Sequence, residues 1–206
     1  MNTPLQQDTA WKPWRKAERE RLIAERLTIS GAARQEIGSR VCARLNTLLN
    51  LPAGAIVSFY WPFKGELNLR NWIVALLDRG FRAALPVVVE KGRPMLFRLW
   101  YPETRMERSI WNIPVPADTP VVTPDVVIAP LVGFDRARFR LGYGGGYFDR
   151  TLASFPEQPL TIGIGYSASE LPTIFPQPHD IPMHLVVTES LVIGNDVPRP
   201  AHRLLR

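Results

Sequence analysis

The sequence predicts an α/β protein: a single domain of α/β/α layers around a largely parallel, Rossmann-like sheet. Short runs rich in β-branched residues alternate along the chain with stretches of helical period. A glycine-rich loop over 142–146 stands between a predicted strand and a predicted helix, where such sheets gather their ligands. With 206 residues and 46% hydrophobic content, the chain is long enough to bury one core.

Two helices are expected in the N-terminal quarter. A basic helix covers about 13–27, beginning near Pro13 because proline is favoured in a first turn. Ser30 is a suitable N-cap for the second helix, because its hydroxyl can accept a backbone hydrogen bond. Apolar residues recur in that second helix at spacings that place them on one face: Ile37, Val41, Leu45 and Leu48.

The pattern then changes to a β-α-β unit. A β-rich run covers 55–60, Asn68 can cap a helix through Leu77 that Gly80 ends, and a second β-rich run covers 85–89. Further strands are expected at 95–100, 126–130, 161–166 and 185–188, and a further helix at 147–155. We expect one domain over 1–194, followed by a basic tail over 195–206.

Composition narrows the classes of function. Lys and Arg number 25 against 19 Asp and Glu, and this net charge of +6 favours anionic partners without choosing among them. Cys42 is the only cysteine, which excludes an intramolecular disulfide and a thiol-based metal cluster and fits a reducing cytoplasm. Neither an apolar signal region nor a run of about eighteen apolar residues occurs, so a cytoplasmic location is expected.

The glycine loop is the strongest functional signal. Glycines can adopt positive φ and turn successive backbone N–H groups towards an anion. Arg140 before the loop matches phosphate oxygens, and Asp149 after it offers the hard oxygen that Mg²⁺ prefers. The loop has neither a Walker A sequence nor the dinucleotide fingerprint, because Tyr147 occupies the third glycine position. The glycines alone fit a plain strand-to-helix turn equally well.

This segment resembles the signature of the 5-formyltetrahydrofolate cyclo-ligase family. The signature runs Pro-x-x-x-Phe-Asp, Arg-Leu-Gly, a glycine run, two aromatics and Asp-Arg. The chain supplies Pro130, Phe134, Asp135, Arg140-Leu141-Gly142, Gly144-Gly145-Gly146, Tyr147-Phe148 and Asp149-Arg150. The basic first helix and the segments 61–67, 85–86, 172–182 and 187–189 also follow the family order.

The resemblance implies an ATP- and Mg²⁺-dependent ligase. It would cyclise 5-formyltetrahydrofolate, with or without a polyglutamate chain, to 5,10-methenyltetrahydrofolate, releasing ADP and phosphate. Phosphorylation of the formyl oxygen would turn a poor leaving group into a good one, so no nucleophilic side chain is needed. We expect a monomer without nucleic-acid or membrane partners.

The resemblance also assigns the site residues. Arg140 and Tyr147 are the catalytic candidates, and Asp149 and Asp180 are the metal ligands. The nucleotide would be bound by Arg15, Arg19, Arg140, Leu141, Gly142, Tyr143, Gly144, Gly145, Gly146, Tyr147 and Phe148. The folate would be bound by Trp61, Glu66, Tyr143, Gly144, Gly145, Gly146 and Tyr147.

Several of these residues have plainer interpretations. Arg15 and Arg19 could lie on a solvated charged helix, since runs such as RKAERERL usually face water. Asp180 could cap a turn, Trp61 could be a core aromatic, and Glu66 could simply precede the Asn68 cap.

The chain departs from the family pattern at four positions. Arg138 replaces a glycine, so either the turn differs there or the extra charge contacts phosphate. Val115 replaces a glutamate, His184 an aspartate and Phe148 a tyrosine. A non-catalytic folate- or nucleotide-binding paralogue is therefore one alternative. A nucleic-acid binder is another, resting on an isoelectric point near 9.9 and six tryptophans.

Overall fold

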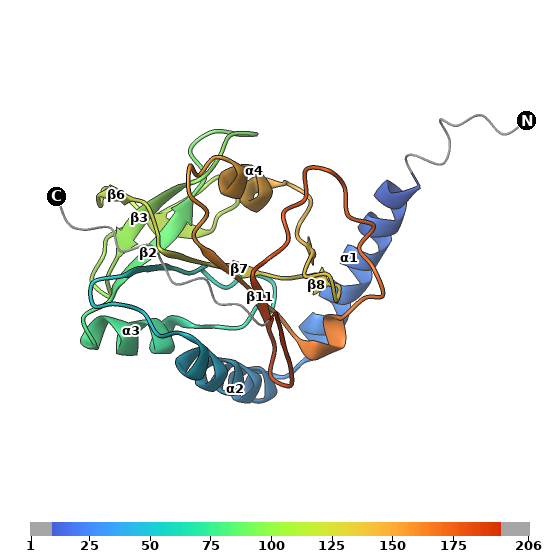
Figure 1. Cartoon of the computed structure of the whole chain (residues 1–206), viewed down its shortest axis with the longest axis horizontal. Coiled ribbons are helices and arrows are strands. Elements are labelled where there is room, and N and C mark those ends of the chain that lie inside the picture. Colours follow the sequence, from blue (N-terminus) through green and yellow to red (C-terminus); the bar gives the residue numbers. More distant parts are fainter. Residues whose placement is uncertain (1–9, 195–206) are drawn as a thin grey trace, which may run out of the picture.

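The computed structural model describes residues 10–194 and confirms the predicted α/β/α layers (Figure 1). The proposed tail over 195–206 lies outside the described residues. One sheet of eight strands has the order β12-β11-β10-β7-β1-β2-β3-β6. Its five central strands are parallel: β11 (Leu185–Val187), β10 (Leu160–Ile164), β7 (Val126–Pro130), β1 (Ile56–Ser58) and β2 (Arg82–Val87). Each outer strand pairs antiparallel with its inner neighbour: β3 (Leu96–Trp100) with β2, β6 (Val121–Val122) with β3, and β12 (Val192–Ile193) with β11.

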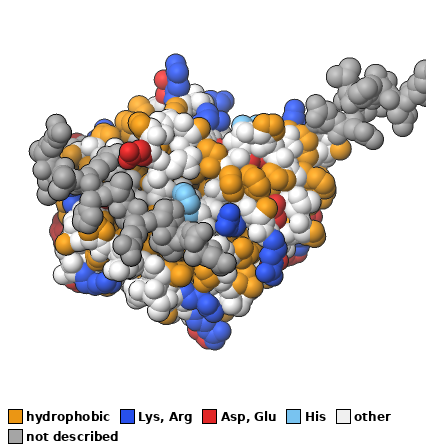
Figure 2. Space-filling view, in the orientation of Figure 1, with side chains coloured by type: hydrophobic (Ala, Val, Ile, Leu, Met, Phe, Trp, Pro, Cys, Tyr) orange, Lys and Arg blue, Asp and Glu red, His pale blue; other side chains and the backbone are white. Residues whose placement is uncertain are grey.

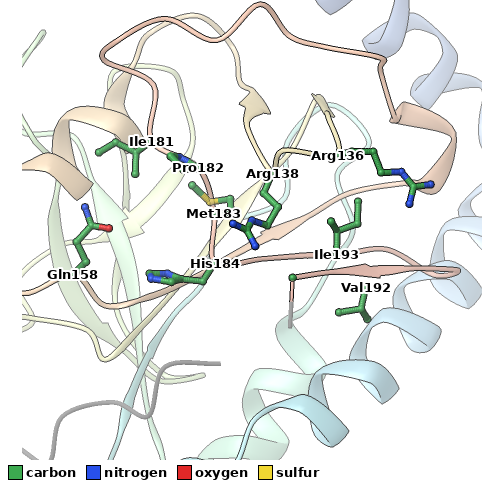
Figure 3. Close-up of a pocket in the computed structure, with 10 residues that line it drawn as sticks. Arg136, Arg138, Gln158, Ile181, Pro182, Met183, His184, Val192 and Ile193 are labelled. Atoms are coloured by element: carbon green, nitrogen blue, oxygen red, sulfur yellow. The ribbon is translucent and has the colours of Figure 1, made fainter. Parts of the chain in front are cut away.

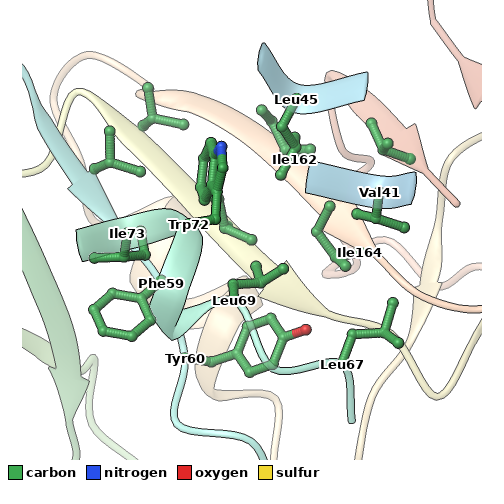
Figure 4. Close-up of a cluster of buried hydrophobic side chains, with 14 of the residues drawn as sticks. Val41, Leu45, Phe59, Tyr60, Leu67, Leu69, Trp72, Ile73, Ile162 and Ile164 are labelled. Atoms are coloured by element: carbon green, nitrogen blue, oxygen red, sulfur yellow. The ribbon is translucent and has the colours of Figure 1, made fainter. Parts of the chain in front are cut away.

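Helices cover both faces of this sheet. Helices α2 (Gly31–Leu48) and α3 (Arg70–Asp78) lie on one face, and the short α4 (Tyr147–Ala153) lies on the other. Alternate residues of β7 point to opposite faces, so Ile128 joins the core under α2 and α3 while Val127 packs with Leu152 of α4. Figure 4 shows side chains from α2, α3 and β10 meeting in the larger core.

Local sequence signals explain most helix ends. The Ser30 Oγ accepts a hydrogen bond of 3.2 Å from the Ala33 N–H and caps α2 as predicted. The start of α3 differs by one residue: the N-cap position is Leu69, although the Asn68 Oδ1 accepts from the Arg70 N–H at 3.1 Å. Gly80 follows α3 with a φ of 84°, a left-handed conformation that favours glycine.

The predicted β-α-β unit is β1, α3 and β2, with β1 and β2 paired in parallel. A second parallel neighbour pair, β7 and β10, is joined through α4. The glycine loop does not follow β7 directly, because a hairpin of β8 (Gly133–Phe134) and β9 (Arg140–Leu141) stands between them. Another hairpin, β4 (Met106–Arg108) with β5 (Pro114–Pro116), follows β3, and a short 3₁₀ turn covers Ser167–Ser169.

Helix α1 (Trp11–Thr28) begins two residues before the predicted start and stands at one end of the molecule, beside β8 (Figure 1). Its Leu22 is buried in a small cluster with Val132, Leu141, Leu171 and Ile174. These partners belong to segments that follow the carboxyl ends of β7 and β10. Helix α1 therefore packs against the loops at the edge of the sheet where ligands of α/β proteins bind.

Candidate active site

The first helix places two arginines against the glycine loop. The Arg19 Nε donates to the Gly142 carbonyl at 2.6 Å, and a Cβ added at Gly144 would lie 3.3 Å from the Arg19 guanidinium carbon. Burial, and then the neighbouring charge of Arg15, lower the pKa of Arg19. A partly desolvated cation crowded by a second cation is stabilised by an anion, so this geometry favours phosphate at the loop.

Arg15 lies one helical turn before Arg19 and is buried, with 8% of its surface exposed. Its Nε donates to the Ile174 carbonyl at 2.9 Å, its Nη2 donates to the Phe175 carbonyl at 3.0 Å, and it forms an ion pair with Asp180. The alternative of a solvated charged helix therefore does not describe Arg15.

The glycine loop needs its glycines for two physical reasons. Gly144 and Gly146 have φ values of 91° and 63°, in the left-handed region. At Gly142 a Cβ would lie 2.6 Å from the Arg140 Nη1, and at Gly145 it would lie 2.7 Å from the Tyr147 ring. The loop is thus closely covered by Arg140 and Tyr147, the two residues expected to be catalytic.

Arg140 lies beneath the loop and is itself buried. Its Nη2 donates to the Asp149 Oδ2 at 2.7 Å, and its guanidinium carbon lies 4.9 Å from the centre of the Phe148 ring. The Arg140 Nε is buried without a hydrogen-bond partner among the described residues. The ring at position 148 thus serves as a platform for the guanidinium, a role that phenylalanine can fill without a hydroxyl.

The two predicted metal ligands lie on neighbouring segments. The Asp149 Oδ1 accepts a hydrogen bond of 3.3 Å from the N–H of Ile181, the residue after Asp180. Burial alone would raise the pKa of Asp180, but hydrogen bonds from Arg15 and the Gln177 N–H outweigh it, so the pKa is lowered and the carboxylate stays ionised.

These residues fit a magnesium ion in their chemistry. Among residues 10–194, no group of three or more His, Cys, Asp and Glu side chains could hold a metal. Mg²⁺ bound beside a nucleotide needs only one or two carboxylates, because phosphate oxygens and water complete its six ligands. Asp149 and Asp180 offer two such carboxylates, each of which is ion-paired with an arginine in this structure.

A buried carboxylate lies on the other side of the loop. Glu66 is 6% exposed, and its oxygens accept hydrogen bonds from the Phe63 N–H at 2.8 Å and the Tyr143 hydroxyl at 3.0 Å. Burial raises the pKa of Glu66 to about 7, although Phe63, Arg26 and Tyr143 each lower it. Tyr143 therefore connects the glycine loop to the segment expected to bind the folate.

Arg26 is a functional candidate that the sequence analysis missed. It is buried, donates to the Tyr143 hydroxyl at 2.6 Å, and is held by the Lys64 and Leu131 carbonyls at 2.9 and 3.2 Å. The sequence does contain a signal for Arg26. Residues 15, 19, 22 and 26 recur at spacings of four, three and four, so Arg26 lies on the same face of α1 as Arg15 and Arg19.

Two aromatics of other segments differ in their contacts, since only Trp111 touches a residue of the proposed site. Trp61 is half-buried at the edge of the larger core, and the Arg70 guanidinium lies 4.7 Å from the centre of its ring. Trp111, at the tip of the β4–β5 hairpin, meets the Tyr147 ring edge-on at a centroid distance of 5.0 Å. Trp111 is 47% exposed, and no local pattern in the sequence pointed to it.

Three of the departures from the family pattern, Arg138, Val115 and His184, form no hydrogen bond with the glycine loop among the described residues. Arg138 adopts a φ of 70°, the conformation that a glycine would favour, so the turn is kept despite the side chain. Arg138 and His184 line a cavity that also includes Ile181, and Val115 is buried in β5.

Comparison with known proteins identifies the family of the chain. The sequence profile described as the 5-formyltetrahydrofolate cyclo-ligase family matches residues 11–189. The 5-formyltetrahydrofolate cyclo-ligase of Escherichia coli K12 is 31% identical over 176 residues, which cover 81% of this chain and 96% of that protein. The corresponding protein of Mycolicibacterium smegmatis is 30% identical over 145 residues, covering 66% of this chain and 74% of that protein.

Solved structures share the fold. The NMR structure of Aquifex aeolicus 5,10-methenyltetrahydrofolate synthetase superposes with a TM-score of 0.73 at 24% identity, covering 92% of this chain and 99% of that one. The Mycoplasma pneumoniae synthetase superposes with a TM-score of 0.70 at 23% identity, covering 85% and 99%. Because the profile spans nearly all of the described residues, the chain belongs to the 5-formyltetrahydrofolate cyclo-ligase family.

Proposed function

We propose that this chain catalyses the ATP- and Mg²⁺-dependent cyclisation of 5-formyltetrahydrofolate to 5,10-methenyltetrahydrofolate, with release of ADP and phosphate. One observation carries the proposal: α1, the glycine loop and the carboxylates of Asp149 and Asp180 converge at the end of the sheet where ligands bind. Family membership supports the cyclisation, and this convergence supports the binding of a triphosphate there.

The substrates would react by a phosphoryl transfer and a ring closure. The formyl oxygen attacks the γ-phosphorus of ATP, and the bond to the β,γ-bridging oxygen breaks, releasing ADP. The N10 nitrogen then attacks the activated formyl carbon, loses its proton, and phosphate leaves with the former formyl oxygen. Positioning and charge neutralisation account for most catalysis of such transfers.

The chain's own residues would position and neutralise these groups. Arg19 and Arg140 would bind phosphate oxygens. Arg140 now forms an ion pair with Asp149, and it would turn part of its guanidinium from that carboxylate to the nucleotide. Asp149 and Asp180 would hold Mg²⁺, which supplies further neutralisation of phosphate charge. Tyr147 covers the loop at Gly145 and would help to exclude water.

Glu66 would recognise the pterin. An ionised carboxylate can accept paired hydrogen bonds from neighbouring amino and ring N–H groups, and Tyr143 and Phe63 already fix its orientation. Trp61, held under Arg70, would cover a ring face.

The direct test is turnover. Purified protein with ATP, Mg²⁺ and 5-formyltetrahydrofolate should develop the absorbance of methenyltetrahydrofolate together with one ADP per product. Omission of ATP or Mg²⁺ is the control. Absence of product over a broad pH range would reject the proposal.

A non-catalytic paralogue is the alternative suggested by Arg138, Val115 and His184. It predicts tight binding of ATP or folate without ADP release. Among the described residues none of the three forms a hydrogen bond with the glycine loop, so the departures give little support to lost catalysis.

A nucleic-acid binder is less well supported. Figure 2 shows basic side chains in separate groups among hydrophobic ones on the face that it displays, instead of one continuous patch. RNA binding that falls steeply with salt and that ATP does not displace would favour that alternative.

We propose that the enzyme acts as a cytoplasmic monomer, because its single cysteine and its nucleotide substrate suit that compartment. In the described part of the chain, no helix is long and apolar enough to cross a membrane. Light scattering of the purified chain and fractionation of cells would test both points.

A further inference from the structure

A cavity of about 860 Å³ lies next to the proposed active site, with which it shares Ile181, and its described lining carries uncompensated positive charge. The described lining comes from the β8–β9 turn, the loop before β10, the segment 181–184 and strand β12. Its polar side chains are Arg136, Arg138, Gln158 and His184. No aspartate or glutamate belongs to this described lining.

Arg138 supplies the charge. Its Nε is buried without a hydrogen-bond partner, and it forms no ion pair with any described residue. Arg136, by contrast, is neutralised at the rim by an ion pair of 2.6 Å with Glu170. A partly buried guanidinium without a counter-charge is costly unless an anion joins it.

The backbone holds Arg138 in this position. Its N–H donates to the Asp135 carbonyl at 2.9 Å, and its carbonyl accepts from the Met183 N–H at 3.0 Å. The positive φ of 70° is rare for arginine, so the turn presents this side chain at the expense of local strain. Strained backbone conformations of this kind are often found at residues that bind ligands.

His184 adds a hydrogen-bond donor to the same cavity. The Thr161 N–H donates to the His184 Nδ1 at 3.0 Å, which makes Nδ1 an acceptor and leaves the ring proton on Nε2. The Nε2 has no hydrogen-bond partner among the described residues. In Figure 3 the His184 ring lies between Gln158 and the guanidinium of Arg138.

We propose that this cavity is a second anion-binding site, in which Arg138 and His184 bind the phosphate or carboxylate group of a small metabolite. Gln158 offers an amide at the far side, and Met183 and Ile193 provide apolar walls for an uncharged body. The proposal does not depend on the reaction at the glycine loop.

The site can be tested with inorganic phosphate and with triglutamate as separate probes. The chain has three histidines, so the imidazole signals can be followed by NMR and His184 assigned with a His184→Gln variant. Either probe should shift the His184 signal. If phosphate binds more tightly, the site prefers a phosphate group, and if triglutamate binds more tightly, it prefers a carboxylate.

The key variant is Arg138→Asn, because asparagine tolerates a positive φ while lacking the charge. It should weaken binding at His184 about tenfold or more, since a charge-assisted contact is lost. The matched control is Arg40→Gln, which removes the same charge from an exposed helical position and should change nothing. An Arg19→Ala variant, altered at the nucleotide loop, should keep the His184 response.

Two outcomes would overturn the proposal. One is a His184 signal that neither probe moves at millimolar concentration. The other is equal binding by Arg138→Asn and by the original chain. Because the readout is local to His184, an inactive enzyme would still give either answer.

Discussion

At the scale of single residues, the site depends on charges held away from water. Arg15, Asp149 and Asp180 are ion-paired, whereas Glu66 is a buried carboxylate that only neutral donors contact directly. This difference separates two parts of the proposed site: the pKa of Asp180 is lowered beside Arg15, whereas the pKa of Glu66 is raised to about 7 in the segment proposed to bind the folate.

Glu66 should therefore give the folate site a pH dependence. Its pKa of about 7 lies above the ordinary 4.5, so the carboxylate that accepts hydrogen bonds from the pterin forms as pH rises through about 7. We expect kcat/KM for the folate to rise over that range, and KM for ATP to change little. Glu66→Gln should lower kcat/KM and remove this rise. An unchanged profile in the variant would contradict the role.

The same pKa predicts a change in stability. The folded chain binds this proton more tightly than the unfolded chain, so the stability contributed by protonated Glu66 is complete below pH 4.5 and is lost as pH rises through about 7. Chemical denaturation of Glu66→Gln should show a gain relative to the original chain that grows over this range to a few kcal/mol, on the order of 3.

Asp149→Asn should chiefly change the response to metal. The substitution keeps the size of the side chain but removes a charged oxygen ligand, so most turnover should be lost and higher Mg²⁺ should restore part of it. Asp118→Asn, at an exposed position, is the matched control. Equal turnover of Asp149→Asn and the original chain at limiting Mg²⁺ would exclude Asp149 as a ligand.

At the scale of elements, α1 carries more function than its composition suggests. Its polar sequence resembles a solvated helix, yet one face places Arg15, Arg19 and Arg26 against the loops, with Leu22 packed among them. The helix is held mainly by these long-range contacts, because Ala10 at its N-cap position forms no side-chain cap hydrogen bond.

Leu22→Ala should reveal this dependence. The substitution leaves a cavity between α1 and the loops and should lower the free energy of unfolding by about 2–5 kcal/mol. KM for ATP should rise more than KM for the folate, because α1 carries the phosphate arginines. Leu27→Ala, at a residue 53% exposed on the same helix, should be nearly neutral in both measurements. Similar losses for both variants would argue against a specific docking role for Leu22.

The elements also show what local sequence can predict. The parallel core strands and the Ser30 cap of α2 follow from apolar runs and a short polar side chain, which are local signals, whereas the N-cap position of α3 is Leu69 and not the predicted Asn68. The β8–β9 hairpin and the edge strands β6 and β12 have only two residues each, too few for a period to be seen. Arg26 and Trp111 depend on partners far along the chain, so their roles required the fold.

At the scale of the whole molecule, the proposed ligands would bind segments from all parts of the chain. Helix α1, the segment 61–67, the glycine loop and the segment 174–181 meet at one edge of the sheet. A ligand there would stabilise the folded state as a unit, because the unfolded chain has no such convergence.

Thermal unfolding should therefore depend on nucleotide. Without folate, ATP with Mg²⁺ at about 100 times its dissociation constant should stabilise the original chain by about 2.7 kcal/mol and raise Tm by several degrees. Arg19→Ala at the same ligand concentrations should show a smaller rise, and Arg40→Gln an unchanged one. Calorimetry that detects no shift for the original chain would contradict a nucleotide site.

The Tyr143 hydroxyl, which donates to Glu66 while its backbone belongs to the glycine loop, has a consequence for how the two substrates sense each other. A triphosphate that displaces the loop on binding must move Tyr143, and it thereby reorients the Glu66 carboxylate that would bind the folate. Linkage then requires each compound to alter the affinity of the other by an identical factor. Cooperative binding of the two substrates would thus arise from one phenol, without any large rearrangement of the protein.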